Sequence, residues 1–205
     1  MEDWKAQYRN FALQEKLLRQ LFVDRFPGDE SRLVAALELA KKAHKGQKRD
    51  EGDPYVIHPI RAARYLAEHL KERDHEVIMA MILHDVVEDT TVTLEQIRQR
   101  FGDRVAQLVD SVTRPRANDE TEEEKLTSKP RNYQKVLSSG NETIRIKAAD
   151  ILDNMRSWEN TKEQTRKSPK ISRWLDEAHR YYFEIGCRAG GTVEQEMRQI
   201  AAMFN

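Results

Sequence analysis

Residues 76–87 (EVIMAMILHDVV) limit the fold more than any other stretch, because they are apolar almost all round. A helix of this kind is buried among its neighbours, so the segment predicts a central helix. It contains His84 and Asp85 and is followed directly by Glu88 and Asp89. Such side chains are buried only when they are paired, bind a metal or line a cleft. The alternative is a helix end that reaches solvent with an ordinary acidic turn, although acidic groups at a helix C-terminus oppose the helix dipole.

The rest of the chain also has helical periodicity, which predicts an all-α fold. It has no clear run of alternating β-branched residues and no Asn-Gly hairpin signal. Further helices are expected at residues 4–26, 31–46, 59–70, 93–101, 105–112, 142–158, 168–188 and 192–204. A loop is expected at residues 48–55, which hold Gly52 and Pro54, and a mobile loop with room for a short helix at the charged segment 114–131.

Composition favours a soluble cytoplasmic protein and gives no support for a nucleic-acid partner. The 205 residues suit one domain with appendages, and 35 basic residues balance 35 acidic ones, so no basic field favours nucleic acid. The single cysteine, Cys187, excludes an intramolecular disulfide and suits a reducing compartment. No apolar run approaches the ~20 residues of a membrane span, and the N-terminus lacks the layout of a signal peptide.

Two histidines and two aspartates, His58, His84, Asp85 and Asp150, form a ligand set suited to one divalent metal. With the acidic pair Glu88-Asp89, they indicate metal-assisted hydrolysis of a phosphate ester. On the predicted helix at 142–158, Lys147, Asp150 and Asn154 form a stripe that borders the apolar face. The alternatives are a Lys147–Asp150 surface pair and a histidine at 58 that only caps or packs.

Five motifs in a fixed order give this chain a family resemblance. They are AHKGQKR (43–49), PYVIHP (54–59), ILHDVVEDT (82–90), FGDRVAQLVDSVT (101–113) and IKAADILDNMR (146–156). Over about residues 33–158 the chain resembles the HD-domain hydrolases of the RelA/SpoT group, which remove pyrophosphate from the 3′ position of (p)ppGpp. The resemblance implies a compact helical HD-domain bundle of about eight to ten helices, spanning residues 31–205 behind a helical extension at 1–30. It also implies a free-standing small alarmone hydrolase, since there is no room for the synthetase and regulatory domains of the long enzymes.

The resemblance also assigns roles to individual residues. It implies that the metal, typically Mn²⁺, is bound by His58, His84, Asp85 and Asp150, and that the attacking water is handled by Glu88 and Asp89. It implies nucleotide contacts by Arg49 beside the guanine, Asn154 at the nucleoside, and Lys45 and Arg156 at phosphate or nucleotide. His44 belongs to the signature but is expected to be structural. The ligand types themselves favour Mn²⁺ over Ca²⁺ or Mg²⁺, with Zn²⁺ or Fe²⁺ as alternatives.

Two departures from the family pattern leave other functions open. Asp50 stands where many members have a lysine, which removes a cation near the nucleotide. Asp153 stands where histidine or tyrosine is common, and we expect it to be harmless because it lies off the stripe of Asp150. One alternative is a related HD nucleotide phosphohydrolase acting on adenosine alarmones or NADPH. Another is a non-catalytic nucleotide-binding regulator that uses the 114–131 loop and the first helix. The oligomeric state is left open.

Overall fold

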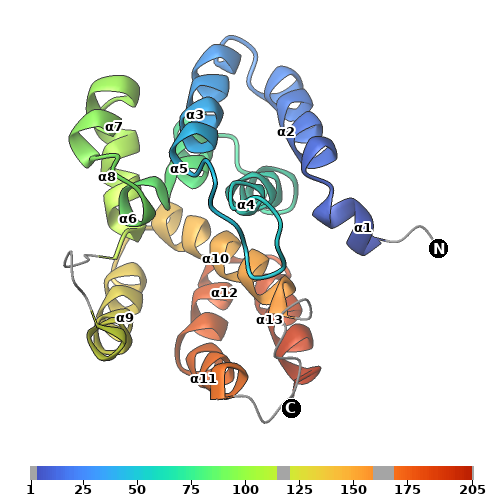
Figure 1. Ribbon diagram of the computed structural model, residues 1–205, viewed down its shortest axis with the longest axis vertical. Helices are drawn as coiled ribbons and strands as arrows, with labels where there is room; N and C mark the ends of the chain where they lie inside the picture. The colour runs from blue at the N-terminus through green and yellow to red at the C-terminus, as the bar shows by residue number, and fades with distance from the viewer. Residues whose placement is uncertain (1–3, 115–120, 159–168, 205) are drawn as a thin grey trace.

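The computed structural model describes residues 4–114, 121–158 and 169–204, and every extended regular element in these ranges is a helix (Figure 1). The predicted all-α class is therefore confirmed. The helices are α1 (Trp4–Arg9), α2 (Phe11–Arg25), α3 (Glu30–Ala43), α4 (Ile57–Glu68), α5 (His75–Leu83), α6 (Val86–Asp89), α7 (Leu94–Phe101), α8 (Asp103–Val112), α9 (Glu122–Leu137), α10 (Asn141–Arg156), α11 (Pro169–Glu177), α12 (Phe183–Ala189) and α13 (Val193–Ala202). Among the helices of the described ranges, none is both long and apolar enough to cross a membrane.

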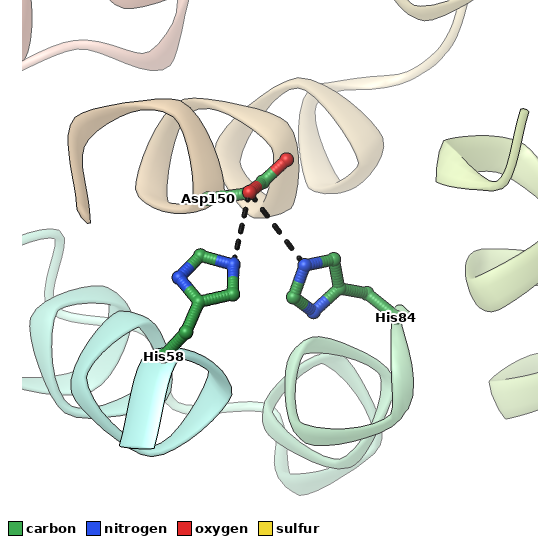
Figure 2. Close-up of side chains that lie close together, drawn as sticks. All are labelled: His58, His84 and Asp150. Atoms are coloured by element: carbon green, nitrogen blue, oxygen red, sulfur yellow. Dashed lines mark ion pairs between the residues drawn. The ribbon is translucent and has the colours of Figure 1, made fainter. Parts of the chain in front are cut away.

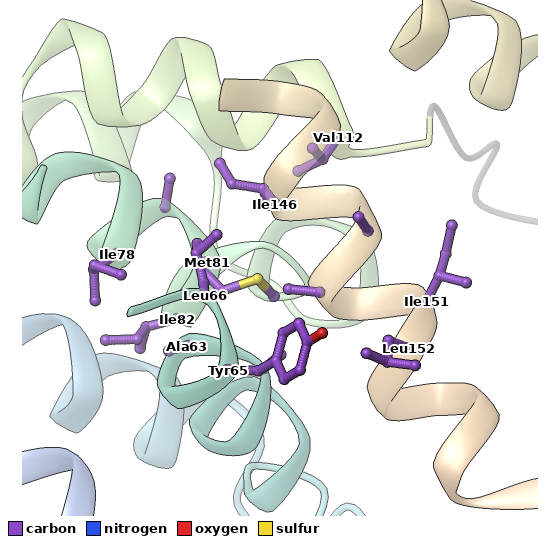
Figure 3. Packing of buried hydrophobic residues seen from close by; sticks show 14 of the residues in the cluster. Ala63, Tyr65, Leu66, Ile78, Met81, Ile82, Val112, Ile146, Ile151 and Leu152 are labelled. Carbon is purple, nitrogen blue, oxygen red and sulfur yellow. The ribbon is translucent and has the colours of Figure 1, made fainter. Parts of the chain in front are cut away.

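Helix α5 forms the centre of the core, as its sequence predicts. Every residue from Val77 to Leu83 is buried, and α5 packs against α3, α4, α8 and α10. Figure 3 shows side chains of α5 and α4, such as Met81 and Leu66, meeting Ile146 of α10. Because α4, α5 and α10 pack on one another at this point, the residues that they carry are held in fixed positions relative to one another.

The central helix ends earlier than its sequence predicts. Instead of running to Val87, α5 stops at Leu83, and His84 and Asp85 form a turn before the short helix α6. The Nδ1 atom of His84 lies 2.8 Å from the carbonyl oxygen of Met81, which fixes the ring at the turn. Asp89 still donates its backbone N–H to the carbonyl of Asp85 at 2.8 Å, so the two acidic residues of α6 stay about one turn beyond the break.

The expected single helix at residues 4–26 is in fact two helices. Asn10 separates α1 from α2 and caps α2, since its side-chain oxygen accepts the backbone N–H of Leu13 at 3.0 Å. Helix α2 packs on α4 and buries Leu18, Leu21 and Phe22 in the main core. Residues 11–25 are therefore part of the same packed body as the central helices.

The charged segment 114–131 differs from the expected loop. Residues 115–120 lie outside the described residues, but from Glu122 onward the chain forms α9, which is longer than the short helix expected. Tyr133 and Val136, beyond the charged part, are buried and fasten α9 to the core. The helix expected at 168–188 forms as α11 and α12 joined by a π-helical turn (Ala178–Tyr182), and Gly190 ends it with φ of +84°.

Candidate metal centre and cavity

Three side chains from three different helical segments converge in the core (Figure 2). His58 lies in the first turn of α4, His84 follows α5, and Asp150 lies in the middle of α10. The Nε2 atoms of His58 and His84 lie 3.1 Å and 3.6 Å from the same oxygen, Oδ1 of Asp150. One ligand atom from each residue lies within 4.8 Å of the others, so one ion could contact all three.

Each imidazole is held through its other nitrogen. The Nδ1 atom of His58 lies 2.8 Å from Oδ2 of Asp153, and that of His84 lies 2.8 Å from the carbonyl oxygen of Met81. Both partners only accept hydrogen bonds, so each Nδ1 carries a hydrogen and each Nε2 faces the centre. Both Nε2 atoms are buried without a hydrogen-bond partner. Buried nitrogens aimed at a carboxylate, with their rings fixed from behind, fit a divalent metal.

The charges around the centre also fit a cation. Burial alone would lower the pKa of His84, but the neighbouring carboxylates of Asp85 and Asp150 raise it well above its ordinary value. Burial alone would raise the pKa of Asp150, but Lys147 and the two imidazoles lower it well below the ordinary value. The carboxylates therefore stay ionised, which favours positive charge between them and the rings.

Asp85, the fourth predicted ligand, lies beside both imidazoles. Its Oδ2 atom is 3.0 Å from Nε2 of His84 and 3.6 Å from Nε2 of His58, and it accepts a hydrogen bond from the Tyr55 hydroxyl at 2.7 Å. It does not belong to the set of three whose ligand atoms all lie within 4.8 Å. Asp85 thus stays a predicted ligand.

The acidic pair of α6 lies at the same site. Glu88 accepts the backbone N–H of Arg114 at 3.1 Å, and its Oε1 atom lies 3.3 Å from Nε of Arg114. Burial raises the pKa of Glu88, as does the charge of Asp85, although Lys147 opposes the shift. Asp89 accepts a hydrogen bond from Tyr55 at 3.1 Å. Glu88 is thus held by Arg114, while Asp89 contacts Tyr55.

The stripe on α10 faces a cavity rather than solvent. Lys147 does pair with Asp150, Nζ to Oδ2 at 2.8 Å, but these side chains are only 15% and 7% exposed. Asn154 donates to Oδ1 of Asp150 at 2.7 Å and accepts from Arg49 at 3.0 Å. Asn154 thus joins the aspartate of the centre to the predicted guanine-binding arginine.

The cavity above the centre has a volume of about 450 Å³. Its lining combines acids, cations and aromatic rings: Lys48, Arg49, Asp50, Glu51, Tyr55, Asp85, Glu88, Asp89, Arg114, Lys129, Tyr133, Lys147, Asp150, Ile151, Asn154, Met155, Ser157, Trp158, Trp174, Glu177 and Tyr182. The indole rings of Trp158 and Trp174 stack on each other, with centroids 5.3 Å apart. A space of this size and polarity suits a charged small molecule with a flat ring.

Two predicted nucleotide contacts lie away from this cavity. Lys45, just after α3, is exposed and does not line it. Arg156 points to the opposite side of α10 from Asn154, where its guanidinium packs 4.8 Å from the centroid of the Tyr65 ring and pairs with Glu196 at 2.5 Å. The signature residue His44 is buried, contacts Gln47 and stacks on Tyr55, which agrees with a structural role.

Sequence reasoning missed several residues at the site, among them Tyr55, Asp153 and Trp174. Tyr55 stands three positions before His58 in the PYVIHP motif, a signal that could have been used. Asp153 is buried and contacts His58, although it was expected to be harmless. Trp174 belongs to α11, outside the stretch that resembles the RelA/SpoT group, so no local motif pointed to it.

An all-α fold with a buried centre of two histidines and an aspartate defines a helical domain that can hold a divalent metal. A family model described as the HD domain matches residues 36–176, which is more than half of the chain. The chain belongs to the HD-domain family.

Its curated relatives are much longer than this chain. It is 38% identical over 159 residues to a protein of Aquifex aeolicus named guanosine-3′,5′-bis(diphosphate) 3′-pyrophosphohydrolase, covering 76% of this chain and 22% of the relative. It is 36% identical over 154 residues to the bifunctional (p)ppGpp synthase/hydrolase SpoT of Escherichia coli, covering 73% and 21%. The chain thus spans about a fifth of the length of these relatives.

Solved structures with this fold are closer in size. One is described as a metazoan ortholog of SpoT that hydrolyzes ppGpp and plays a role in starvation responses. It has a TM-score of 0.71 and 27% identity, and the match covers 83% of this chain and 94% of that one. A protein of Listeria monocytogenes matches with a TM-score of 0.55 and 29% identity, covering 75% and 97%.

Proposed function

We propose that the protein hydrolyses the 3′-pyrophosphate of (p)ppGpp, releasing pyrophosphate and GDP or GTP, with Mn²⁺ as cofactor. The proposal rests on one observation: Asp150 of the His58–His84–Asp150 centre lines a cavity whose other lining residues include cations and aromatic rings. The choice of a guanosine alarmone is supported by the names of the Aquifex and E. coli relatives and by the ppGpp hydrolysis described for the metazoan ortholog of SpoT.

In this proposal His58, His84, Asp85 and Asp150 hold the ion. Imidazole together with carboxylate is a ligand mixture that suits a first-row metal such as Mn²⁺, with the contacts of Asp153 and Met81 keeping each Nε2 aimed at it. When bound, such an ion supplies Lewis-acid chemistry, lowering the pKa of a water molecule and offsetting negative charge on the phosphate.

The acidic pair handles the water. Water attacks the phosphorus joined to the ribose 3′ oxygen and the bond from that phosphorus to the 3′ oxygen breaks. The 3′ oxygen takes up a proton to become the hydroxyl of GDP or GTP, and pyrophosphate is released. Glu88 orients the water and accepts its proton, helped by a pKa that burial raises above its ordinary value, and Asp89 supports it. Arg114 holds the Glu88 carboxylate in place.

The rest of the cavity binds the nucleotide. Arg49, whose guanidinium donates to Asn154 and to Ser157 at 3.0 Å and 3.2 Å, lies beside the base. Asn154 seats the nucleoside, and lining cations such as Lys129 and Lys147 face phosphate oxygens. Aromatic residues in the lining, among them Trp174, offer surfaces on which a purine can stack.

A second candidate substrate class is an adenosine alarmone or NADPH, and Asp50 favours it. The Asp50 carboxylate pairs with Nζ of Lys170 at 2.5 Å and so joins the 48–55 loop to α11. Asp50 therefore replaces a cation near the nucleotide with a bridge to α11, the helix that carries Trp174. The Asp50–Lys170 pair changes the edge of the cavity at which the nucleotide base and its substituents would enter.

We also propose the cellular setting and the division of the chain. The protein acts in the cytoplasm on a small nucleotide, without a nucleic-acid or membrane partner, consistent with its balanced charge and single cysteine. Residues 1–30 form a helical extension, and residues 31–205 form the metal-dependent phosphohydrolase domain.

A substrate panel tests the proposed function directly. Protein supplied with Mn²⁺ is expected to convert ppGpp to GDP and pyrophosphate, measured by anion-exchange chromatography, and EDTA is expected to stop the reaction. pppGpp, the adenosine analogues and NADPH are compared at equal concentration. Faster turnover of an adenosine nucleotide or NADPH would move the assignment to the second class. Mn²⁺ binding without turnover of any of them would contradict an enzymatic function and favour a nucleotide-binding regulator.

Arg49→Gln is expected to raise KM for ppGpp by about 10- to 100-fold while changing kcat less, since a hydrogen bond to a charged group contributes about 1.5–3 kcal/mol. The measurement is steady-state kinetics with Mn²⁺ at saturation. Arg73→Gln is the matched control, because Arg73 is exposed and does not line the cavity, and its KM should equal that of wild type. Equal KM values for the two variants would remove Arg49 from the nucleotide site.

A further inference from the structure

We propose that Tyr8 and Asp153 are positioning residues that fix the His58 imidazole for metal binding. Helix α1, which carries Tyr8, thereby supports the metal centre without supplying a ligand to it. This rests on the proposed metal-dependent function. The side chain of Asp153 contacts His58 directly, and Tyr8 donates its hydroxyl to the same carboxylate. Tyr8 thus joins the N-terminal helix to a residue 145 positions away in the sequence.

Every lone pair of the Asp153 carboxylate is used. Oδ1 accepts from the Tyr8 hydroxyl and from Nε of Arg61 at 2.9 Å, and Oδ2 accepts from Nη2 of Arg61 at 2.9 Å and from Nδ1 of His58 at 2.8 Å. A carboxylate offers about four acceptor sites, so this one is saturated and cannot rotate without losing a bond. Its Oδ2 atom is therefore aimed permanently at His58.

The carboxylate also keeps its charge. Asp153 is 3% exposed, and both of its carboxylate oxygens are paired with the Arg61 guanidinium, at 2.9 Å each. An ionised carboxylate can only accept, so His58 must present Nδ1–H to it and turn Nε2 toward Asp150. A carboxylate behind a ligand histidine fixes the ring and raises the basicity of the nitrogen that binds metal.

Tyr8 contributes twice to this arrangement. Its ring covers the Arg61 guanidinium, with the Cζ atom 3.9 Å from the ring centroid, and its hydroxyl occupies Oδ1 of Asp153. The next residue, Arg9, binds the Asp53 carboxylate at 2.9 Å and the Glu51 carbonyl at 3.0 Å. Helix α1 is therefore fastened both to the support of His58 and to the loop that carries Arg49.

A purely structural role for this cluster predicts something different. If the Asp153–Arg61 pair only joined α4 to α10, its loss would lower the stability of the metal-free protein and leave the metal affinity of the folded protein unchanged. Positioning of His58 instead predicts weaker metal binding. The dissociation constant for Mn²⁺ therefore separates the two roles without any assay of hydrolysis.

The test uses full-length Tyr8→Phe and Asp153→Asn, with Mn²⁺ alone as the probe. Free Mn²⁺ is measured by electron paramagnetic resonance, and the free energy of unfolding is measured in urea with EDTA present. Asp153→Asn should weaken Mn²⁺ binding by about 10- to 100-fold, the usual cost of losing such support. Tyr8→Phe keeps the ring over Arg61 and should weaken binding by about three- to tenfold, the effect of one hydrogen bond.

Tyr65→Phe is the matched control. Tyr65 is also buried and donates its hydroxyl to a carboxylate, Glu196 at 2.8 Å, but away from His58. It should lower the free energy of unfolding and leave Mn²⁺ affinity within about twofold of wild type. Unchanged Mn²⁺ affinity in both Tyr8→Phe and Asp153→Asn, with normal binding in wild type, would overturn this inference alone. Wild-type protein that binds no Mn²⁺ would overturn the proposed function as well.

Discussion

Asp150→Ala is expected to abolish Mn²⁺ binding and, with it, hydrolysis of ppGpp. Asp150 supplies the one carboxylate in the set of three mutually close ligand atoms, and its Oδ1 atom faces both imidazoles. Without it, Asp85 would be the one negatively charged group left among the four proposed ligands. Because a metal contributes several kcal/mol to the transition state, kcat/KM should fall by roughly a thousandfold or more.

Two measurements make the result specific. Mn²⁺ binding is followed by calorimetry, and folding by circular dichroism, since removal of Asp150 also leaves Lys147 without its partner at 2.8 Å. Asp150→Asn, which keeps the shape of the side chain, should lose binding in the same way. Asp110→Asn on α8 is the control, because that side chain is 59% exposed and does not line the cavity. Full activity in Asp150→Ala would refute the ligand assignment.

Glu88→Gln is expected to keep Mn²⁺ affinity within about threefold of wild type and to lower kcat by about 10²- to 10⁴-fold, the range attributed to a general base. Glutamine can still accept the backbone N–H of Arg114, which wild-type Glu88 accepts at 3.1 Å, so the side chain should stay in place. What it loses is the ability to take a proton from water. The measurement is single-turnover kinetics at saturating Mn²⁺ and ppGpp.

Asp89→Asn is the informative partner variant for this experiment. Asp89 accepts a hydrogen bond from the Tyr55 hydroxyl at 3.1 Å, whereas burial raises the pKa of Glu88, so we expect a smaller loss of kcat in Asp89→Asn. A larger loss of kcat in Asp89→Asn than in Glu88→Gln would assign proton transfer to Asp89. Loss of Mn²⁺ affinity in Glu88→Gln would make Glu88 a metal ligand instead. Glu95→Gln, on α7 with a 59% exposed side chain, should behave as wild type.

The parts of the fold that follow from local periodicity could be predicted from the sequence. The apolar run before His84 does form the buried helix α5, and the stripe of Lys147, Asp150 and Asn154 does border the core on α10. Both depend on the spacing of residues along a single helix, which can be read directly from the sequence. The roles of the predicted metal and water-handling residues stay predictions until the variants above are measured.

What the sequence could not provide depends on contacts between distant segments. The helix is expected to continue through His84, because Val86 and Val87 extend the apolar run beyond Asp85, whereas the turn there directs the ring toward Asp150. Asp153 is expected to be harmless because it lies off the stripe of Asp150, and the sequence does not show its partners Tyr8 and Arg61, which lie 145 and 92 positions away. Helix α9 was largely missed, because its first half is charged and its anchors Tyr133 and Val136 come later.

The arrangement of the ligands on α4, at the end of α5 and on α10 links occupancy of the centre to folding. The three residues are far apart in the chain, at positions 58, 84 and 150, and come together only when the central helices pack. An unfolded chain therefore has no comparable site, and an ion bound to the folded state would hold α4, the end of α5 and α10 together. At a free concentration one hundred times the dissociation constant, such a ligand adds about 2.7 kcal/mol to stability. The supply of metal in the cell would then control how long the protein survives as well as whether it reacts.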